Sequence, residues 1–332
     1  MRFLAFLGSR ILTYLLVIWI GITAVFFIPR FVPSDPVAAM LGRITAQASF
    51  MQPDQITSMR NSLAESFGLQ GTLWEQYTHF LKRVLISGDF GPSLAMFPTP
   101  VTDLVRQYLP WSLALLLTST IIAWVLGNLI GLLAGFWKDK TFSKVLEGAA
   151  IAVYPIPYYI LALTLIILFA YLVPIFPFSF TQSGKQFSFV WFQSVIFSSL
   201  LPALSIVLGG MGWWVISMKA LSSSIAEEDF VQFARLKGVS DWNIMRSYVA
   251  RNAMLPQITV LALQLGGIFN GALITEILFG YPGVGTLMYQ AVLQSDYNLM
   301  LGTISLSIVA VATATLVIDL AYPLLDPRIR HR

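Results

Sequence analysis

The sequence predicts an all-α membrane protein with six transmembrane helices. Of its 332 residues, 57% are hydrophobic and only 11% are charged, and the mean hydropathy is +0.75. Soluble domains carry about 25% charged residues, so this chain has too little charge to cover a water-soluble surface. Its long apolar runs are continuous and lack the ten-residue alternation of barrel strands, which indicates helices.

Six segments are long enough to cross a hydrocarbon core of about 30 Å as helices. They are residues 10–30, 109–136, 147–172, 196–218, 258–279 and 299–322. Gly127, Gly131 and Gly135 place small residues on one face of the second segment, which predicts close packing against another helix. Pro155 and Pro157 predict a kink or a break early in the third segment.

Lysine and arginine are unevenly distributed between the two faces that these segments define. With the N-terminus in the cytoplasm, the inner segments are 1–10, 137–146, 219–257 and 323–332. They hold two, three, five and three Lys and Arg in that order, which is thirteen of the 20 in the chain. Because cytoplasmic loops are enriched in Lys and Arg, this bias predicts a multi-pass protein with both termini cytoplasmic. The net charge of +4 therefore reflects topology and does not indicate nucleic acid.

The predicted organisation has four parts. They are an N-terminal transmembrane helix (1–31), an extracytoplasmic cap region (32–108), a transmembrane core (109–322) with a cytoplasmic loop (219–257), and a cytoplasmic basic tail (323–332). The first helix is expected to be retained, because residues 11–28 are long for the core of a signal peptide.

The cap region contains two predicted amphipathic helices, 54–67 and 74–86. The second places Trp74, Tyr77, Phe80, Leu81 and Val84 on one face. A turn is expected at Ser34-Asp35-Pro36, before these helices. The region either covers the ends of the spanning helices or docks a partner on the outer side, and the residues leave both interpretations open.

Motifs for covalent chemistry or metal binding are not found. The chain has no P-loop, no H-E-x-x-H and no G-x-S-x-G, it has no cysteine, and its two histidines, His79 and His331, stand alone. The chain is therefore expected to be no enzyme and to bind no cofactor or metal. Glu147, Glu276 and Asp319 are carboxylates in or near the apolar segments, and we expect structural pairing or capping there rather than ion coupling.

The most informative stretch is the charged run 227–256, which lies between two apolar segments. Glu228 and Asp229 suit the positive end of a helix dipole, Arg235 and Lys237 suit its negative end, and Gly238 is a stop signal. A second helix is expected over 241–254, ending before Pro256. The run either lies on the inner leaflet as an amphipathic helix or docks a cytoplasmic protein. Apolar surface on the first helix comes from Phe230, Val231, Phe233, Ala234 and Leu236.

This loop resembles the E-A-A-x-x-x-G loop found in permease subunits of ABC importers. The match is Gln232-Phe233-Ala234-Arg235-Leu236-Lys237-Gly238, with Gln232 and Phe233 where the general pattern has glutamate and the first alanine. Four further segments resemble the dipeptide, oligopeptide and nickel permease group. They are residues 33–36, 251–256, 276–285 and 326–330.

The resemblance implies a type I ABC importer permease fold in a prokaryotic plasma (inner) membrane. Residues 228–238 would form a coupling helix that fits a groove on a cytoplasmic ATPase, with Phe230 or Phe233 as an anchor and small residues allowing close approach. The implied contact residues are Glu228, Asp229, Phe230, Phe233, Ala234, Arg235, Lys237 and Gly238. The implied partners are a homologous second permease subunit, two cytoplasmic ATPase subunits that bind ATP and Mg, an extracytoplasmic substrate-binding protein and the lipid bilayer.

The translocation path and the cargo are less well defined by the sequence. Candidate path residues are Trp213, Trp214, Gln264 and Asn270, although helix packing explains the tryptophans equally well. The resemblance implies peptide cargo, with oligosaccharide and chelated nickel as alternatives. A secondary transporter or a channel is the rival class, but neither repeated halves, mid-membrane ion-coupling residues nor a selectivity filter is visible.

Overall fold

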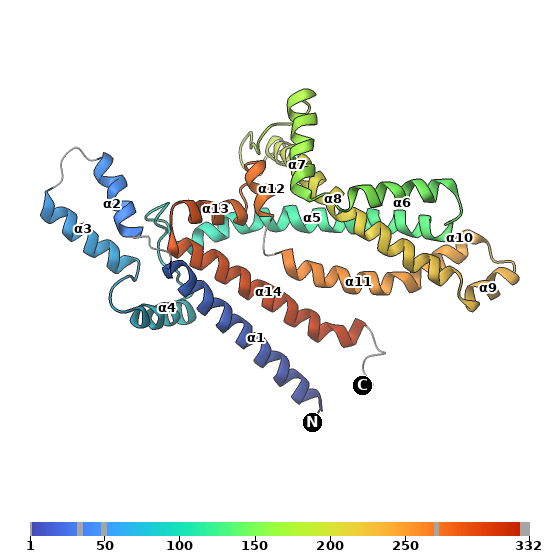
Figure 1. Cartoon of the computed structure of the whole chain (residues 1–332), viewed down its shortest axis with the longest axis horizontal. Coiled ribbons are helices and arrows are strands. Elements are labelled where there is room, and N and C mark those ends of the chain that lie inside the picture. The colour runs from blue at the N-terminus through green and yellow to red at the C-terminus, as the bar shows by residue number, and fades with distance from the viewer. Residues whose placement is uncertain (1, 32–35, 48–51, 269–271, 326–332) are drawn as a thin grey trace. The chain divides into compact units, whose positions relative to one another are not determined.

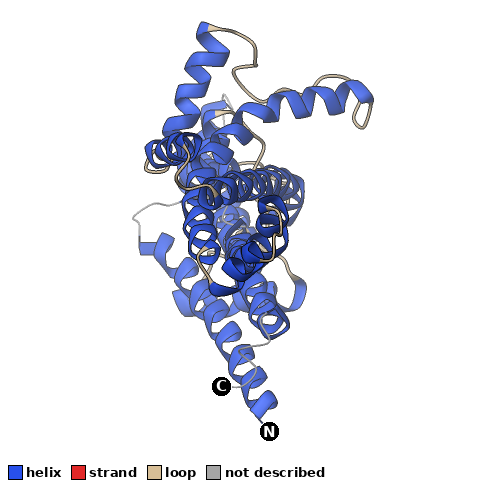
Figure 2. Ribbon diagram, turned by 90° about the vertical axis from the view of Figure 1, so that its right-hand side faces the viewer, coloured by secondary structure: helices blue, strands red, loops and turns tan. Residues whose placement is uncertain are grey.

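A computed structural model of the chain describes residues 2–31, 36–47, 52–268 and 272–325. These residues form helices joined by loops, as Figures 1 and 2 show, and contain no β-strand, although an isolated bridge pairs Pro92 with Pro100. The predicted all-α class is confirmed. The helices are grouped into two compact units, which we describe separately.

Four described helices are long and apolar enough to cross a membrane. They are α1 (Arg2–Phe27, apolar from Leu7), α5 (Val101–Phe136), α8 (Phe189–Ala226) and α14 (Tyr297–Leu325). A fifth span is formed if α6 (Thr141–Val153) and the segment Tyr158–Leu172 count together; they are bent by 95° at a short break. Pro155 and Pro157 lie in that break, so the predicted interruption is confirmed.

The expected segment 258–279 corresponds to two helices, α11 (Ala250–Gly267) and α12 (Leu273–Leu278), and residues 269–271 lie outside the described part. Upstream of α11 are α10 (Asp241–Ile244) and a π-helical turn, η3 (Met245–Val249). The prediction that helix 241–254 stops before Pro256 is wrong, because α11 continues through this proline. Ala253 and Gln257, on either side of it, are both fully buried, so packing offsets the missing backbone hydrogen bond.

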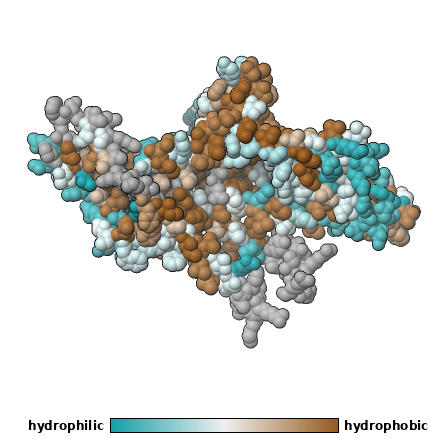
Figure 3. All heavy atoms as spheres, in the orientation of Figure 1, coloured by the Kyte–Doolittle hydropathy of each residue, from teal (hydrophilic) through white to brown (hydrophobic). Residues whose placement is uncertain are grey.

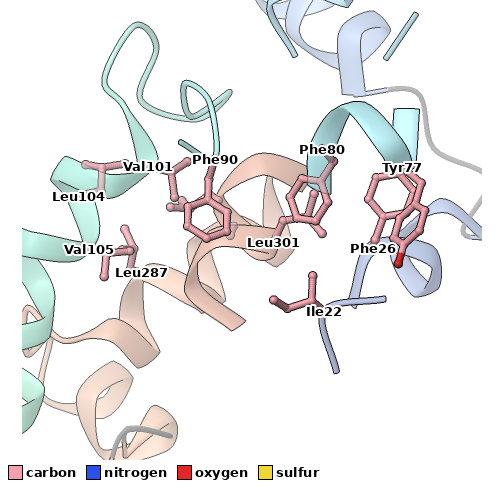
Figure 4. Packing of buried hydrophobic residues seen from close by; sticks show 12 residues of the cluster. Ile22, Phe26, Tyr77, Phe80, Phe90, Val101, Leu104, Val105, Leu287 and Leu301 are labelled. Atoms are coloured by element: carbon pink, nitrogen blue, oxygen red, sulfur yellow. The ribbon is translucent and has the colours of Figure 1, made fainter. Parts of the chain in front are cut away.

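The first unit contains α1, η1 (Ile28–Phe31), α2 (Pro36–Gln47), α3 (Pro53–Ser66), α4 (Leu73–Ser87), the first turns of α5, α13 (Val284–Leu293) and most of α14. α1 and α14 lie side by side in Figure 1, and a hydrogen bond of 3.1 Å joins the hydroxyls of Tyr14 and Thr313. The core between these helices and α4 is aromatic: Phe26 packs against Tyr77 and Phe80 with ring centroids 5.2 and 5.3 Å away (Figure 4).

Helices α3 and α4 confirm the two amphipathic helices predicted in the cap region. Thr72 and Glu75 form a capping box at the start of α4, and Gly88, with φ +61°, ends it. Of the predicted apolar face, Tyr77 and Phe80 are buried, whereas Trp74 is largely exposed. Helix α2 was not predicted, and the expected turn at 34–36 lies mostly outside the described residues.

The second unit contains the rest of α5, α6, α7 (Tyr158–Ile166) with the π-helical η2 (Ile167–Leu172), α8, α9 (Asp229–Leu236), α10, η3, α11 and most of α12. The glycine stripe of α5 packs directly on α8. A Cβ on Gly131 would lie 2.6 Å from the carbonyl oxygen of Val215 and 2.8 Å from Cβ of Met218. This close approach confirms the predicted packing role of the stripe.

Candidate coupling surface

Helix α9 is a short surface helix held by one buried face. α8 ends at Ala226, Glu228 is the extended N-cap residue, and α9 begins at Asp229. Val231 and Ala234 are buried in a cluster with Phe136 at the end of α5 and with residues of η3 and α11. The cluster joins α9 to the ends of the long helices, so the position of α9 depends on theirs.

The C-terminus of α9 forms a Schellman motif. Gly238 has φ +76°, its N–H donates to the carbonyl of Arg235 at 2.9 Å, and the N–H of Val239 donates to the carbonyl of Ala234 at 3.2 Å. Glycine adopts this left-handed conformation without the steric penalty of a Cβ. The stop that the sequence predicted at Gly238 is confirmed.

The opposite face of α9 exposes apolar side chains. Phe230, Phe233 and Leu236, spaced by three residues, have exposed fractions of 43%, 59% and 86%. Hydrophilic residues gather around this end of the second unit, over α9 and α10 (Figure 3). The ring of Phe233 lies 4.5 Å from Nζ of Lys237. An apolar face within a polar surface is typical of a docking site.

Two ion pairs tie the ends of the long helices together near α9. Lys138, in the loop after α5, pairs with Glu227, the C-cap residue of α8. Hydrogen bonding to Lys138 and its charge lower the pKa of Glu227, and the same contact raises the pKa of Lys138. Glu147 of α6 pairs with Lys219 of α8, so the predicted structural pairing of Glu147 is confirmed.

The residues predicted to contact an ATPase all lie on or beside α9, but they do not share one face. Glu228 and Asp229 are exposed at its start, and Arg235 and Lys237 are exposed at its end. Ala234, expected to allow close approach of a partner, instead faces the core of its own unit. The other three predicted residues are Phe230 and Phe233 on the exposed apolar face and Gly238 at the end of the helix.

Two exposed apolar residues on or near α9 lie outside the predicted contact set. Leu236 is the most exposed apolar residue of α9, and Trp242 of α10, a few residues further on, is 58% exposed. The spacing of Phe230, Phe233 and Leu236 is the signal that could have added Leu236. Nothing in the sequence distinguished Trp242 from a buried tryptophan.

The four candidate path residues have different surroundings. Trp214 is fully buried, and its Cβ lies against Gly127 of α5, so it serves helix packing. Trp213 is half-buried, with its ring centroid 4.7 Å from that of Trp214. Gln264 is exposed on α11, and Asn270 lies outside the described residues.

Long apolar helices and a short exposed helix between two of them define an integral membrane protein with a surface outside the spans. The family model for the binding-protein-dependent transport system inner membrane component matches residues 127–331, most of the chain. The chain belongs to this family. It is therefore an inner membrane component of a transport system.

Individual relatives align over nearly the whole chain. The dipeptide transport system permease protein DppB of Escherichia coli is 30% identical, with 95% of each chain covered. The oligopeptide permease proteins AppB of Bacillus subtilis and OppB of Haemophilus influenzae are each 28% identical, covering 95% and 99% of this chain and 96% and 100% of their own lengths. The resemblance to the dipeptide and oligopeptide permease group is confirmed.

Proposed function

We propose that this chain is the permease subunit of an ATP-driven importer of peptides. The cargo assignment rests on similarity along nearly the full length to permeases whose names specify dipeptides and oligopeptides. The chain would form half of the translocation path with a homologous second permease subunit. An extracytoplasmic binding protein would deliver the peptide, and two separate ATPase subunits would bind ATP and Mg.

The proposed contact with the ATPase is the exposed face of α9. Its three apolar side chains provide desolvation energy, and the charged residues around them provide orientation. Because Val231 and Ala234 attach the other face to the ends of α5 and α11, a displacement of α9 is transmitted to those helices. This attachment supports a mechanical rather than a catalytic role for the chain.

The proposed topology places both termini and α9 in the cytoplasm. Four lysines lie near the helix ends that adjoin α9, namely the end of α5, the start of α6 and the end of α8: Lys138, Lys140, Lys144 and Lys219. This agrees with the enrichment of cations on the inner side. Six spans follow if α6 with Tyr158–Leu172 and α11 with α12 each cross once. The cap of α2, α3 and α4 would then lie outside, where the binding protein docks.

Uptake by the reconstituted transporter tests this function. The complex in proteoliposomes, with its binding protein outside and ATP inside, is expected to accumulate labelled di- and oligopeptides and to leave an oligosaccharide and a nickel chelate outside. Uptake that persists without the ATPase subunits would refute the importer assignment. ATP-dependent uptake of sugar or nickel instead of peptide would refute only the cargo.

The exposed face of α9 is tested separately by Phe233→Ala. Anchors of this kind contribute more than about 1 kcal/mol to binding, so co-purification of the ATPase is expected to fall about fivefold or more. Phe142→Ala, which removes a comparably exposed phenylalanine from α6, is the matched control and is expected to leave co-purification unchanged. Equal behaviour of the two variants would contradict the assignment.

A further inference from the structure

The second unit contains an apolar cavity that coupling and transport do not explain. It has a volume of about 460 Å³ and lies between the last turns of α5, the C-terminal part of α8 and the segment from α10 to α11. That volume falls within the range of about 300–1,000 Å³ common for ligand sites. All of its lining residues belong to the second unit.

The walls of the cavity are hydrocarbon. Leucines and methionines are prominent in the lining: Leu129, Leu132 and Leu133 of α5, Met218 of α8, and Met245 and Met254. Methionine side chains adapt to flexible apolar ligands. A peptide would be poorly accommodated, because its backbone N–H and C=O groups would be desolvated without partners. An alkyl chain has no such requirement.

One cation lines this hydrocarbon surface. Arg246 of η3 is exposed, and the described lining contains no carboxylate that could neutralise it. Asn128, the other non-aromatic polar residue of the lining, is almost fully buried and donates through Nδ2 to the carbonyl of Trp124 at 2.7 Å. The cavity therefore combines an apolar interior with a single positive charge that is accessible from outside.

Two tryptophans add to this pattern. Trp124 and Trp242 both line the cavity, and Trp242 is largely exposed. Tryptophan is enriched at the level of lipid headgroups, where one part of the ring is apolar and the N–H is hydrated. Lys138 and Lys140 follow directly after the end of α5, as expected for a helix end at a membrane surface.

We infer that this cavity binds an anionic phospholipid, with an acyl chain among the leucines and methionines and the phosphate at Arg246. Basic pockets between spanning helices are known to take anionic headgroups, and each basic residue near the surface contributes about 1 kcal/mol. The inference depends on the membrane location of the chain and not on its cargo. Failure of peptide uptake would leave it standing.

Native mass spectrometry of the purified transporter tests the headgroup. Wild type is expected to retain phosphatidylglycerol about fivefold better than phosphatidylcholine, the factor corresponding to one such charge. Arg246→Gln should abolish this preference. Arg251→Gln, which removes an exposed arginine that does not line the cavity, is the matched control and should preserve it. Equal lipid retention by the two variants would overturn the inference.

The acyl chain is tested by filling the cavity. Ala250→Phe should reduce retention of both lipids, whereas Ala220→Phe, at an exposed site on α8, should not. Thermal unfolding of each variant establishes that it is folded. A phosphatidylglycerol with a photoreactive group at the end of its acyl chain should label the lining of α5 in wild type and lose that label in Ala250→Phe.

A competing occupant is a side chain of the second permease subunit. The chain has no cysteine, so Leu129→Cys introduces a single reactive thiol in the cavity. Modification of this thiol by the photoreactive lipid in the assembled transporter supports the inference. A disulfide between it and a cysteine in the second subunit, without lipid labelling, would show that protein fills the cavity and would overturn the inference.

Discussion

The carboxylate of Asp296 accepts a hydrogen bond from Oγ of Ser93 at 2.5 Å, joining two loops that are 203 residues apart in the sequence. Both side chains are fully buried. The same carboxylate accepts the N–H of Ala95 at 2.9 Å and, through its other oxygen, the N–H of Leu299 at 3.0 Å, which caps the start of α14. One side chain thus links the loop before α5 to the start of the last helix.

Asp296→Ala is therefore expected to destabilise the protein by about 3 kcal/mol, because a helix cap is lost and buried donors are left without acceptors. Thermal unfolding of the purified transporter measures the change. Asp103→Asn alters an exposed acid in the first turn of α5 and is the control. A melting temperature for Asp296→Ala equal to that of the control would contradict this role.

Gly131→Ala is expected to separate α5 from α8. Its Cβ would overlap the backbone of Val215, and overpacking of this kind costs about 1–3 kcal/mol. Gly148→Ala on α6 is a matched control, because its Cβ would meet no atom within 4 Å. That control should stabilise the helix by about 0.5–1 kcal/mol. Chemical unfolding in detergent compares the two, and a stabilising Gly131→Ala would refute the packing assignment.

The pair formed by Lys138 and Glu227 is expected to make the attachment of α9 depend on pH. A lowered pKa of Glu227 means that its contribution is complete above the pKa of the unfolded chain and is lost as the pH falls through the lowered value. A raised pKa of Lys138 means that its contribution is complete below the unfolded pKa and is lost as the pH rises through the raised value.

Amide hydrogen exchange of α9, corrected for intrinsic rates, measures this dependence. Protection of the α9 amides should be greatest at pH values between the unfolded-chain pKa of Glu227 and that of Lys138. Lys138→Glu should reduce it, and the exchange of charges in Lys138→Glu with Glu227→Lys should restore it. If the double variant exchanges as fast as Lys138→Glu alone, the pair does not hold α9.

Gly238→Val is expected to disturb the end of α9 by about 1–2 kcal/mol, because a β-branched residue must adopt φ +76°. The space around Gly238 is open, so the cost is conformational and not steric contact with other residues. Gly238→Asn is the control, because asparagine tolerates this backbone region. The ratio of ATP hydrolysed to peptide transported should rise in the valine variant only. An equal rise in both variants would contradict the conformational explanation, because it would indicate that any side chain at this position obstructs the partner.

Much of the fold was predictable because a membrane imposes simple rules. Apolar length identified α1, α5, α8 and α14, since an unpaired backbone is excluded from hydrocarbon. Pro155 and Pro157 identified the break after α6, and Gly238 identified the end of α9, because each acts through its own backbone. The end expected before Pro256 was wrong for the opposite reason: packing of neighbouring residues outweighed a local preference.

The sequence by itself determined the class of the protein, its four long apolar helices among the described residues and the position of its charged loop, all of which follow from local composition. Only the tertiary structure decided which side of α9 is free. Val231 and Leu236 are both apolar, yet one is buried and the other is the most exposed apolar residue of its helix. The tertiary structure also decided the role of Asp296 and the existence of the cavity beside Arg246, because both depend on side chains brought together from distant parts of the chain.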